Sequence, residues 1–309
     1  MSYVSIRVST LRGEQKIDFN AYLKINGKML LYLRRGDSFE GERLNRLKDK
    51  KLKKMFILDD EENKYREYLQ KNIEMAYDEK SGKDIVARAE IVQGQQQSNA
   101  EEVFEDPNNI EAYSHAKEAA SKYVQFLMGN SKAVGAIMNI LNEDFSVAHH
   151  GVNVSGLSIA LAQKLNMIDP KQNQLLALGA LLHDIGLNES GIALNRPRSD
   201  FSREELLIYK QHPTLGTQKV REMKHFDNTV LKIIAQHEEH IDGSGFPTGA
   251  RESELDPLSI LVSSANALDR LLTFEKIPRH DAVKKLMIEQ VGCHPLNQIQ
   301  LLGEIVKGF

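Results

Sequence analysis

The chain has 309 residues, with 40 Lys and Arg against 43 Asp and Glu and a formal net charge of −3 at pH 7. This length predicts one or two domains, and the near-neutral balance gives no electrostatic case for binding a nucleic acid polymer. The single cysteine, Cys293, excludes a disulfide framework and a cysteine-based metal site. No apolar run approaches the roughly 18 residues of a membrane span. Since the N-terminus also lacks a signal-peptide pattern, we expect a cytoplasmic protein without a membrane span.

The first part of the chain has the pattern of a small α+β domain. Residues 3–8 alternate like a strand, and residues 20–33 hold two more strand-like runs around the Asn-Gly pair at 26–27, a strong hairpin signal. A helical pattern follows at 61–77. The basic run at 48–54 is followed directly by acidic residues, so we interpret it as a solvated face, with a partner-binding patch as the alternative.

A change in composition divides the chain. Residues 93–99 are polar and low in complexity, and residues 105–109 form a further cluster of helix breakers. We therefore predict a first domain at 1–95 and, at 96–309, a linker and a second domain. Residues 110–141 are expected to form one or two helices that lead into the second domain.

Four histidines lie on helical stripes in the second domain. His150, His183, His212 and His237 are each spaced three or four residues from apolar positions, so each is expected to point into the core. A buried imidazole left without a partner costs roughly 1–3 kcal/mol. One such histidine is usually a satisfied core residue, but four stripes each carry one and Asp184 directly follows His183. Nitrogen and oxygen donors without thiolate suit a divalent transition metal.

Other polar residues accompany this set. Carboxylates follow His237 just before a turn rich in Gly and Ser at 242–247. In the helical stretch 260–272, Asn266 and Asp269 share a face, so either one can reach a metal near the histidines.

The helix that leads to His212 has a clear start. Ser202 and Glu205 match a capping box. Pro213 directly follows His212, and we predict that the helix breaks there and restarts toward Met223. Such a break would let the imidazole aim away from the regular helical direction.

These motifs, in this order, resemble the HD-GYP family, a branch of the HD phosphohydrolases. The resemblance covers residues 146–275 and is carried by the segments 150–154, 180–186, 195–197, 204–205, 212–216 and 237–247. It implies an all-helical domain with two or three metals, often iron or manganese, that hydrolyses the bacterial second messenger cyclic di-GMP to pGpG or GMP. By analogy with family members, residues 1–95 would be a regulatory or partner-binding domain of a signalling protein.

The resemblance also implies a ligand set. The first metal would be held by His150, His183, Asp184 and Asn266. The second would share Asp184 as a bridging, catalytic carboxylate and add His212, His237 and Glu238. We expect two divalent ions, with iron favoured and manganese as the alternative. Asp269 would be the family's second, structural Asp, and a neighbour of Glu238 would be the ligand if the register is shifted by one.

The chain departs from the family pattern at five positions. Glu238 replaces a His, Asn266 an Asp, Leu187 a Lys and Phe246 a Tyr, while Ser146 stands where members with a third metal carry Glu. Ser146 therefore favours two metals. Leu187 is the largest catalytic concern, because a Lys there would put a cation beside the phosphate.

Two functions follow as expectations. One is a cyclic di-GMP phosphodiesterase in which a hydroxide activated by two metals attacks phosphorus. The alternative is a weak or inactive module that acts in signalling by binding a nucleotide or a protein. Phe246, Lys276 and Arg279 are the candidate substrate contacts. Hydrolysis of a different, related nucleotide is a third possibility, since Leu187 and Phe246 alter the pocket. We expect cyclic di-GMP hydrolysis by the natural protein to be slow or absent, and Leu187→Lys to raise it more than Phe246→Tyr does.

Overall fold

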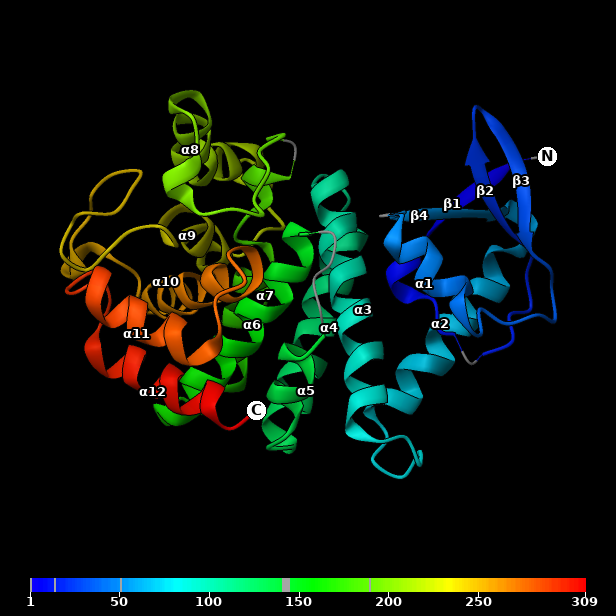
Figure 1. Cartoon of the computed structure of the whole chain (residues 1–309), viewed down its shortest axis with the longest axis horizontal. Coiled ribbons are helices and arrows are strands. Elements are labelled where there is room, and N and C mark those ends of the chain that lie inside the picture. The colour runs from blue at the N-terminus through cyan, green and yellow to red at the C-terminus, as the bar shows by residue number, and fades with distance from the viewer. Residues whose placement is uncertain (1, 14, 51, 141–144, 189) are drawn as a thin grey trace. The chain divides into compact units, whose positions relative to one another are not determined.

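The protein folds into two compact units, Met1–Ser98 and Asn99–Phe309 (Figure 1). The computed structural model describes residues 2–13, 15–50, 52–140, 145–188 and 190–309. The predicted fold class is confirmed: the chain is mostly helical, and a small α+β part precedes the helical domain.

The first unit is built on one antiparallel sheet of four strands in the order β1-β4-β2-β3. The strands are β1 (Tyr3–Arg7), β2 (Ala21–Ile25), β3 (Lys28–Leu33) and β4 (Lys54–Leu58). The predicted hairpin is confirmed: Ile25 pairs with Lys28, and Asn26 and Gly27 have φ values of 49° and 77°. This left-handed backbone is what a two-residue hairpin turn requires.

The helices of the first unit close its core. They include α1 (Glu42–Asp49) and α2 (Glu62–Tyr77), and α2 matches the predicted helix at 61–77. Tyr65 and Tyr68 of α2 pack edge-on against Phe19. Strand β4 was not predicted, because its short apolar run follows the basic residues; Lys51 of that basic run lies outside the described residues.

The polar segment at 93–99, predicted from its composition to belong to a linker, is helical. The helix α3 (Ile85–Glu105) runs through it without a break. Gln93 and Gln97 are buried and bonded to each other, and a side chain on Gly94 would collide with the Ser9 carbonyl. Gln is a good helix former, and burial here comes from tertiary packing rather than from apolar composition. The helix ends at Glu105, as the breaker cluster predicted.

The second unit is a helical domain. Its helices are α4 (Ile110–Gly129), α5 (Ala133–Met138), α6 (Val147–Lys164), α7 (Pro170–Leu182), α8 (Arg203–Val220), α9 (Asn228–Gln236), α10 (Pro257–Asp269), α11 (Arg279–Glu289) and α12 (Leu296–Lys307). The prediction of one or two helices at 110–141 is confirmed by α4 and α5, although Leu141 lies outside the described residues. Within the described part of the chain, no helix is long and apolar enough to cross a membrane.

Close packing of backbones positions the histidine-bearing elements. Helices α6 and α7 lie side by side in Figure 1, and a side chain on Gly151 would collide with the Leu181 carbonyl. A side chain on Gly186, in the 3₁₀ turn Ile185–Leu187 after α7, would collide with the His212 carbonyl of α8. Because only glycine leaves room for these approaches, α6 packs closely against α7, and the turn after α7 packs closely against α8.

Helix α8 begins as predicted but does not break. Both hydrogen bonds of the Ser202–Glu205 capping box are present, whereas Pro213 lies inside the continuous helix. Proline lacks the N–H that would bond the carbonyl four residues earlier. That carbonyl, on Tyr209, lies 2.5 Å from Nδ1 of His212, so the histidine side chain replaces the missing backbone donor.

Candidate metal centre

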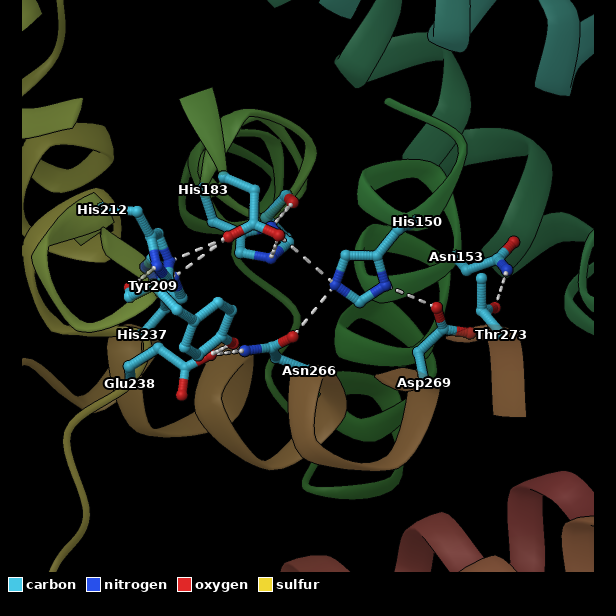
Figure 2. A network of polar contacts seen from close by, with 12 residues as sticks. His150, Asn153, His183, Tyr209, His212, His237, Glu238, Asn266, Asp269 and Thr273 are labelled. Atoms are coloured by element: carbon cyan, nitrogen blue, oxygen red, sulfur yellow. Dashed lines mark hydrogen bonds and ion pairs between the residues drawn. The ribbon is translucent and has the colours of Figure 1, made fainter. Parts of the chain in front are cut away.

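Four buried imidazoles converge in the helical domain (Figure 2). His150 comes from α6, His183 directly follows α7, His212 comes from α8 and His237 directly follows α9. Each is at most 1% exposed. The predicted direction of all four histidines, into the core, is therefore confirmed.

Hydrogen bonds fix which ring nitrogen faces the centre. Nδ1 of His183, His212 and His237 each lies 2.5–2.9 Å from a backbone carbonyl oxygen three residues earlier. A carbonyl only accepts, so each Nδ1 donates its proton. Nδ1 of His150 lies 2.6 Å from Oδ2 of Asp269. All four rings therefore direct Nε2 toward the centre, and a proton on Nδ1 leaves Nε2 free to bind a metal.

The Asp184 carboxylate lies between the four Nε2 atoms. Its Oδ1 is 3.0 Å from His212 and 3.3 Å from His237, and its Oδ2 is 3.3 Å from His183 and 3.7 Å from His150. The Nε2 atoms of His212 and His237 are only 2.7 Å apart. One carboxylate with an oxygen toward each pair of histidines has the arrangement of a ligand that bridges two metals.

The charges of the centre favour cations. Burial disfavours a charged imidazole at His183, yet Asp184 outweighs it and raises the pKa of His183. Burial likewise opposes ionisation of Asp184, but neighbouring His183 holds the pKa of this carboxyl well below its usual range. Burial lowers the pKa of His237 to about 4, so this ring is neutral at pH 7. The neutral His237 ring and the ionised Asp184 carboxylate are in the form that binds a metal, whereas metal binding at His183 would displace the proton that its raised pKa favours.

These residues form two groups of potential metal ligands that share Asp184. One is His150, His183 and Asp184, and the other is Asp184, His212 and His237; in each group the ligand atoms lie within 4.8 Å of one another. Nε2 of His183 and Oδ1 of Asp184 are buried without a hydrogen-bond partner in the described structure. Orphaned nitrogen and oxygen atoms of this kind fit two divalent metals.

The two further predicted ligands lie at the edge of the centre. Oδ1 of Asn266 is 3.0 Å from Nε2 of His150, and its Nδ2 donates to Oε1 of Glu238 at 3.2 Å. Tyr209 also donates to Oε1 of Glu238, and Arg198 donates to its Oε2 at 3.1 Å. Burial would raise the pKa of Glu238, but the charges of Arg198 and Arg270 lower it overall. Glu238 is thus an ionised carboxylate beside the histidines.

Glu239 lies in a different environment. Its carboxylate accepts four hydrogen bonds from the turn that follows, from Thr248, Gly249 and Ala250. These bonds direct Glu239 into the turn, while Glu238 bonds to Asn266 within the centre. The geometry therefore favours Glu238 over its neighbour as a candidate ligand.

The departures Leu187 and Phe246 lie in an apolar cluster against the centre. Leu187 is 2% exposed and packs with Leu194, Phe201, Tyr209 and Phe274, with Phe246 at the margin. The Phe246 ring lies edge-on to the Tyr209 ring at 5.9 Å and to the His212 ring at 6.3 Å. The position that carries Lys in the family pattern is therefore an apolar packing position here.

The two predicted substrate cations contact other groups. Arg279 bonds to Oδ1 of Asn139 at 2.5 Å and lies over the Phe309 ring, so its contacts do not support a role near the histidines. The Lys276 ammonium lies 5.0 Å from the centre of the Phe145 ring, which packs against the apolar cluster. Their binding of substrate stays a prediction.

Two arginines beside the centre were missed. Arg198 follows a proline in a short 3₁₀ turn, and its charge reaches Glu238. Arg270 directly follows Asp269 and is 2% exposed. The available signal for Arg270 was its spacing of four from Asn266, which puts both on one helical face.

The single cysteine lies beside two side chains that are potential metal ligands. Cys293, His240 and Asp242 form a third group whose potential ligand atoms lie within 4.8 Å of one another, outside the four-histidine centre. The sequence did not indicate this grouping, because His240 and Asp242 lie far from Cys293 along the chain, and the predicted absence of a cysteine metal site stays a prediction.

Comparison with known proteins agrees with this geometry. A family model described as an HD domain matches residues 116–288. The solved structure of Bd1817, an HDG"Y"P protein from Bdellovibrio bacteriovorus, is 65% identical, with a TM-score of 0.94 over 99% of this chain and 100% of that chain. The chain therefore belongs to the HD domain family and, within it, to the HD-GYP proteins.

Two curated relatives are more distant. The cyclic di-GMP phosphodiesterase PA4108 of Pseudomonas aeruginosa is 25% identical over 159 residues, which cover 51% of this chain and 38% of that protein. A cyclic di-GMP phosphodiesterase of Thermotoga maritima is 30% identical over 167 residues, which cover 51% of this chain and 42% of that protein. The chain thus spans about two-fifths of the length of these relatives.

Proposed function

We propose that this protein is a phosphodiesterase that hydrolyses cyclic di-GMP with two divalent metal ions, iron or alternatively manganese. The observation that carries the proposal is the convergence of four Nε2 atoms on the two oxygens of buried Asp184. The names of the two curated relatives support the substrate.

The residues of the centre have distinct roles in this proposal. Two metals, when bound, supply an activated hydroxide and draw electron density from the phosphate. Asp184 and the four histidines would hold the metals, and Asp269 and the backbone carbonyls fix the imidazoles with Nε2 toward Asp184. The apolar cluster around Leu187 keeps bulk water out, which strengthens every charge interaction inside.

The reaction consumes one water per bond. Hydroxide oxygen joins phosphorus, the ester bond to the leaving ribose oxygen breaks, and that oxygen takes a proton. Cyclic di-GMP thereby opens to the linear dinucleotide pGpG.

A metal analysis coupled to an assay tests the proposal. Protein purified without oxygen and loaded with iron or manganese should hold two metals per chain and open cyclic di-GMP. Asp184→Asn should lose both properties, while Asp281→Asn, at an exposed position on α11, should keep them. A wild-type protein that holds two metals but leaves cyclic di-GMP intact would refute the enzymatic proposal.

A second candidate function is binding without hydrolysis. Leu187, buried in apolar contacts where the family pattern has Lys, favours it, because a cation that could stabilise the transition state is missing there. In the same assay this candidate requires that cyclic di-GMP binds metal-loaded protein and is recovered unchanged.

The first unit also receives a proposed role. We propose that it is a regulatory or partner-binding domain, with a domain boundary near residue 95. Its own buried core, from Ile6 to Tyr68, supports a separately packed unit. Comparing hydrolysis rates of the full chain with and without a candidate signalling protein tests this role.

A further inference from the structure

Arg270 is a buried cation without a hydrogen-bond partner. It is 2% exposed, and its Nε, Nη1 and Nη2 are all buried without an acceptor in the described structure. It also makes no ion pair with a carboxylate of the described residues. An unpaired buried charge is costly, and each such group in a native structure requires an explanation.

Arg270 lies next to both halves of the metal centre. Its guanidinium carbon is 4.8 Å from the centre of the Tyr209 ring and 5.6 Å from that of Phe274. The Tyr209 ring is 4.9 Å from the ring of His212, and the Phe274 ring is 4.9 Å from the ring of His150. One aromatic ring therefore separates Arg270 from each pair of histidines.

The neighbouring carboxylates bond to groups other than Arg270, although Oδ1 of Asp269 is itself buried without a hydrogen-bond partner in the described structure. Glu238 accepts from Tyr209, Asn266 and Arg198. Asp269, the residue before Arg270, directs Oδ2 to His150. One guanidinium nitrogen of Arg198 donates a hydrogen bond to Glu238. No nitrogen of the Arg270 guanidinium has an acceptor in the described structure. The local backbone is also unusual: Arg270 begins a π-helical turn, Arg270–Phe274, and such turns are frequent at functional sites.

We propose that Arg270 binds the phosphate group that enters the metal centre. A guanidinium presents two parallel N–H donors that match two oxygens of a phosphate, and charge-assisted bonds of this kind are strong. Arg270 thereby supplies, from a different helix, the positive charge that Leu187 does not. The identity of the phosphate as part of cyclic di-GMP rests on the proposed function; the phosphate site itself does not.

Arg270 is about as buried as the candidate metal ligands. Asp184 is also 2% exposed and Glu238 is 4% exposed. A phosphate bound beside the histidines would therefore lie among groups that are as buried as Arg270.

Binding of inorganic phosphate tests the proposal directly. Metal-loaded wild type is compared by calorimetry with Arg270→Met, Arg270→Lys and the exposed control Arg221→Gln, with metal content matched by elemental analysis. We expect Arg270→Met to weaken phosphate binding by about tenfold or more, because it removes a charge-assisted pair of bonds. Arg270→Lys should weaken it less, and Arg221→Gln should leave it within about twofold.

Thermal unfolding without phosphate separates binding from a structural role. Met fits the aromatic surroundings and removes an unpaired charge, so Arg270→Met should melt at the same temperature as wild type or higher. A lower melting temperature, or a failure to fold, would assign Arg270 to the structure and overturn the proposal. Wild-type phosphate affinity in folded, metal-loaded Arg270→Met would also overturn it.

The same variants distinguish this proposal from the proposed function. If Arg270→Met loses phosphate while wild type does not hydrolyse cyclic di-GMP, the phosphate site stands and the phosphodiesterase fails. If wild type is active and Arg270→Met has unchanged phosphate affinity and KM, the phosphodiesterase stands and the phosphate site fails.

Discussion

At the scale of single residues, the geometry of the centre depends on which nitrogen of each imidazole carries the proton. Three histidines give Nδ1–H to backbone carbonyls, whose position is set by the helices themselves. His150 differs, because its partner is the side chain of Asp269. The orientation of this one imidazole can therefore be changed without altering the backbone.

Asp269→Asn should loosen one metal in preference to the other. An amide can present its NH₂ group to His150, which would shift the ring proton to Nε2, the atom that faces the centre. We expect about 10–100-fold weaker affinity at the His150 side, the usual cost of losing such a partner. Titration with a competing chelator measures it, and the exposed Asp281→Asn is the control. Equal loss of both metals would contradict this role.

His294 should make stability depend on pH. Burial lowers its pKa to about 3, so the folded protein keeps the ring neutral while the unfolded chain binds a proton below about 6.5. As pH falls from 6.5 toward 4, the unfolded state binds more protons and the free energy of unfolding decreases.

Comparison of wild type with His294→Gln isolates the contribution of this titration to stability. The stability advantage of wild type over His294→Gln should shrink by roughly 1.4 kcal/mol per pH unit in this window. Urea unfolding of both proteins at several pH values measures it. An advantage that stays constant from pH 7 to 4.5 would show that His294 does not titrate as described.

At the scale of elements, local pattern predicted some features and tertiary contacts decided others. The hairpin around Asn26 and Gly27 and the capping box at Ser202 follow from local chemistry, so both were predictable. The histidine stripes were predictable because apolar spacing sets which face is buried. The buried helix through residues 93–99 was not, because Gln93 is buried only by packing against distant residues.

In the candidate site, too, some features could be predicted from the sequence and others could not. The convergence of His150 and Asp184 could be predicted, because the histidine and Asp motifs occur along the chain in the order typical of the HD-GYP family. The isolation of Arg270 could not be predicted, because absence of a partner is a property of three-dimensional surroundings. Pro213 misled the prediction for a related reason: a side-chain donor on His212 compensates for the missing N–H.

The sequence led us to expect that Leu187→Lys raises hydrolysis, but the apolar surroundings of Leu187 lead to the opposite expectation. Leu187→Lys would bury an ammonium group among Phe201, Tyr209 and Phe274. We now expect a loss of several kcal/mol in stability and no gain in hydrolysis, because an unpaired buried charge is costly. Leu187→Met, which conserves volume, should cost less than about 1.5 kcal/mol.

Melting temperatures and cyclic di-GMP assays on both Leu187 variants decide this. A stable Leu187→Lys protein with faster hydrolysis than wild type would restore the original expectation and show that the apolar cluster rearranges around the new charge.

At the scale of the whole helical domain, the metals would act as a shared cross-link. Side chains from α6, α8 and α10, and from the ends of α7 and α9, meet at Asp184 and its four histidines. Removing the ions should therefore loosen several helices at once rather than one loop.

Metal removal should lower the melting temperature of the domain cooperatively. Binding at 100 times the dissociation constant stabilises a fold by about 2.7 kcal/mol, which is lost when the ion is removed. Calorimetric scans before and after chelation, and after metal is restored, test this. A melting temperature that does not change on removal of both ions would exclude the cross-link.

The burial of the centre has a consequence for how metal is acquired. With all four histidines at most 1% exposed, an ion would enter or leave only when this part of the domain opens. Exchange then proceeds at the rate of that opening, whatever the affinity of the ligands. A metal bound at this centre would therefore tend to be the one present when the helices close, because later exchange would need the domain to open again.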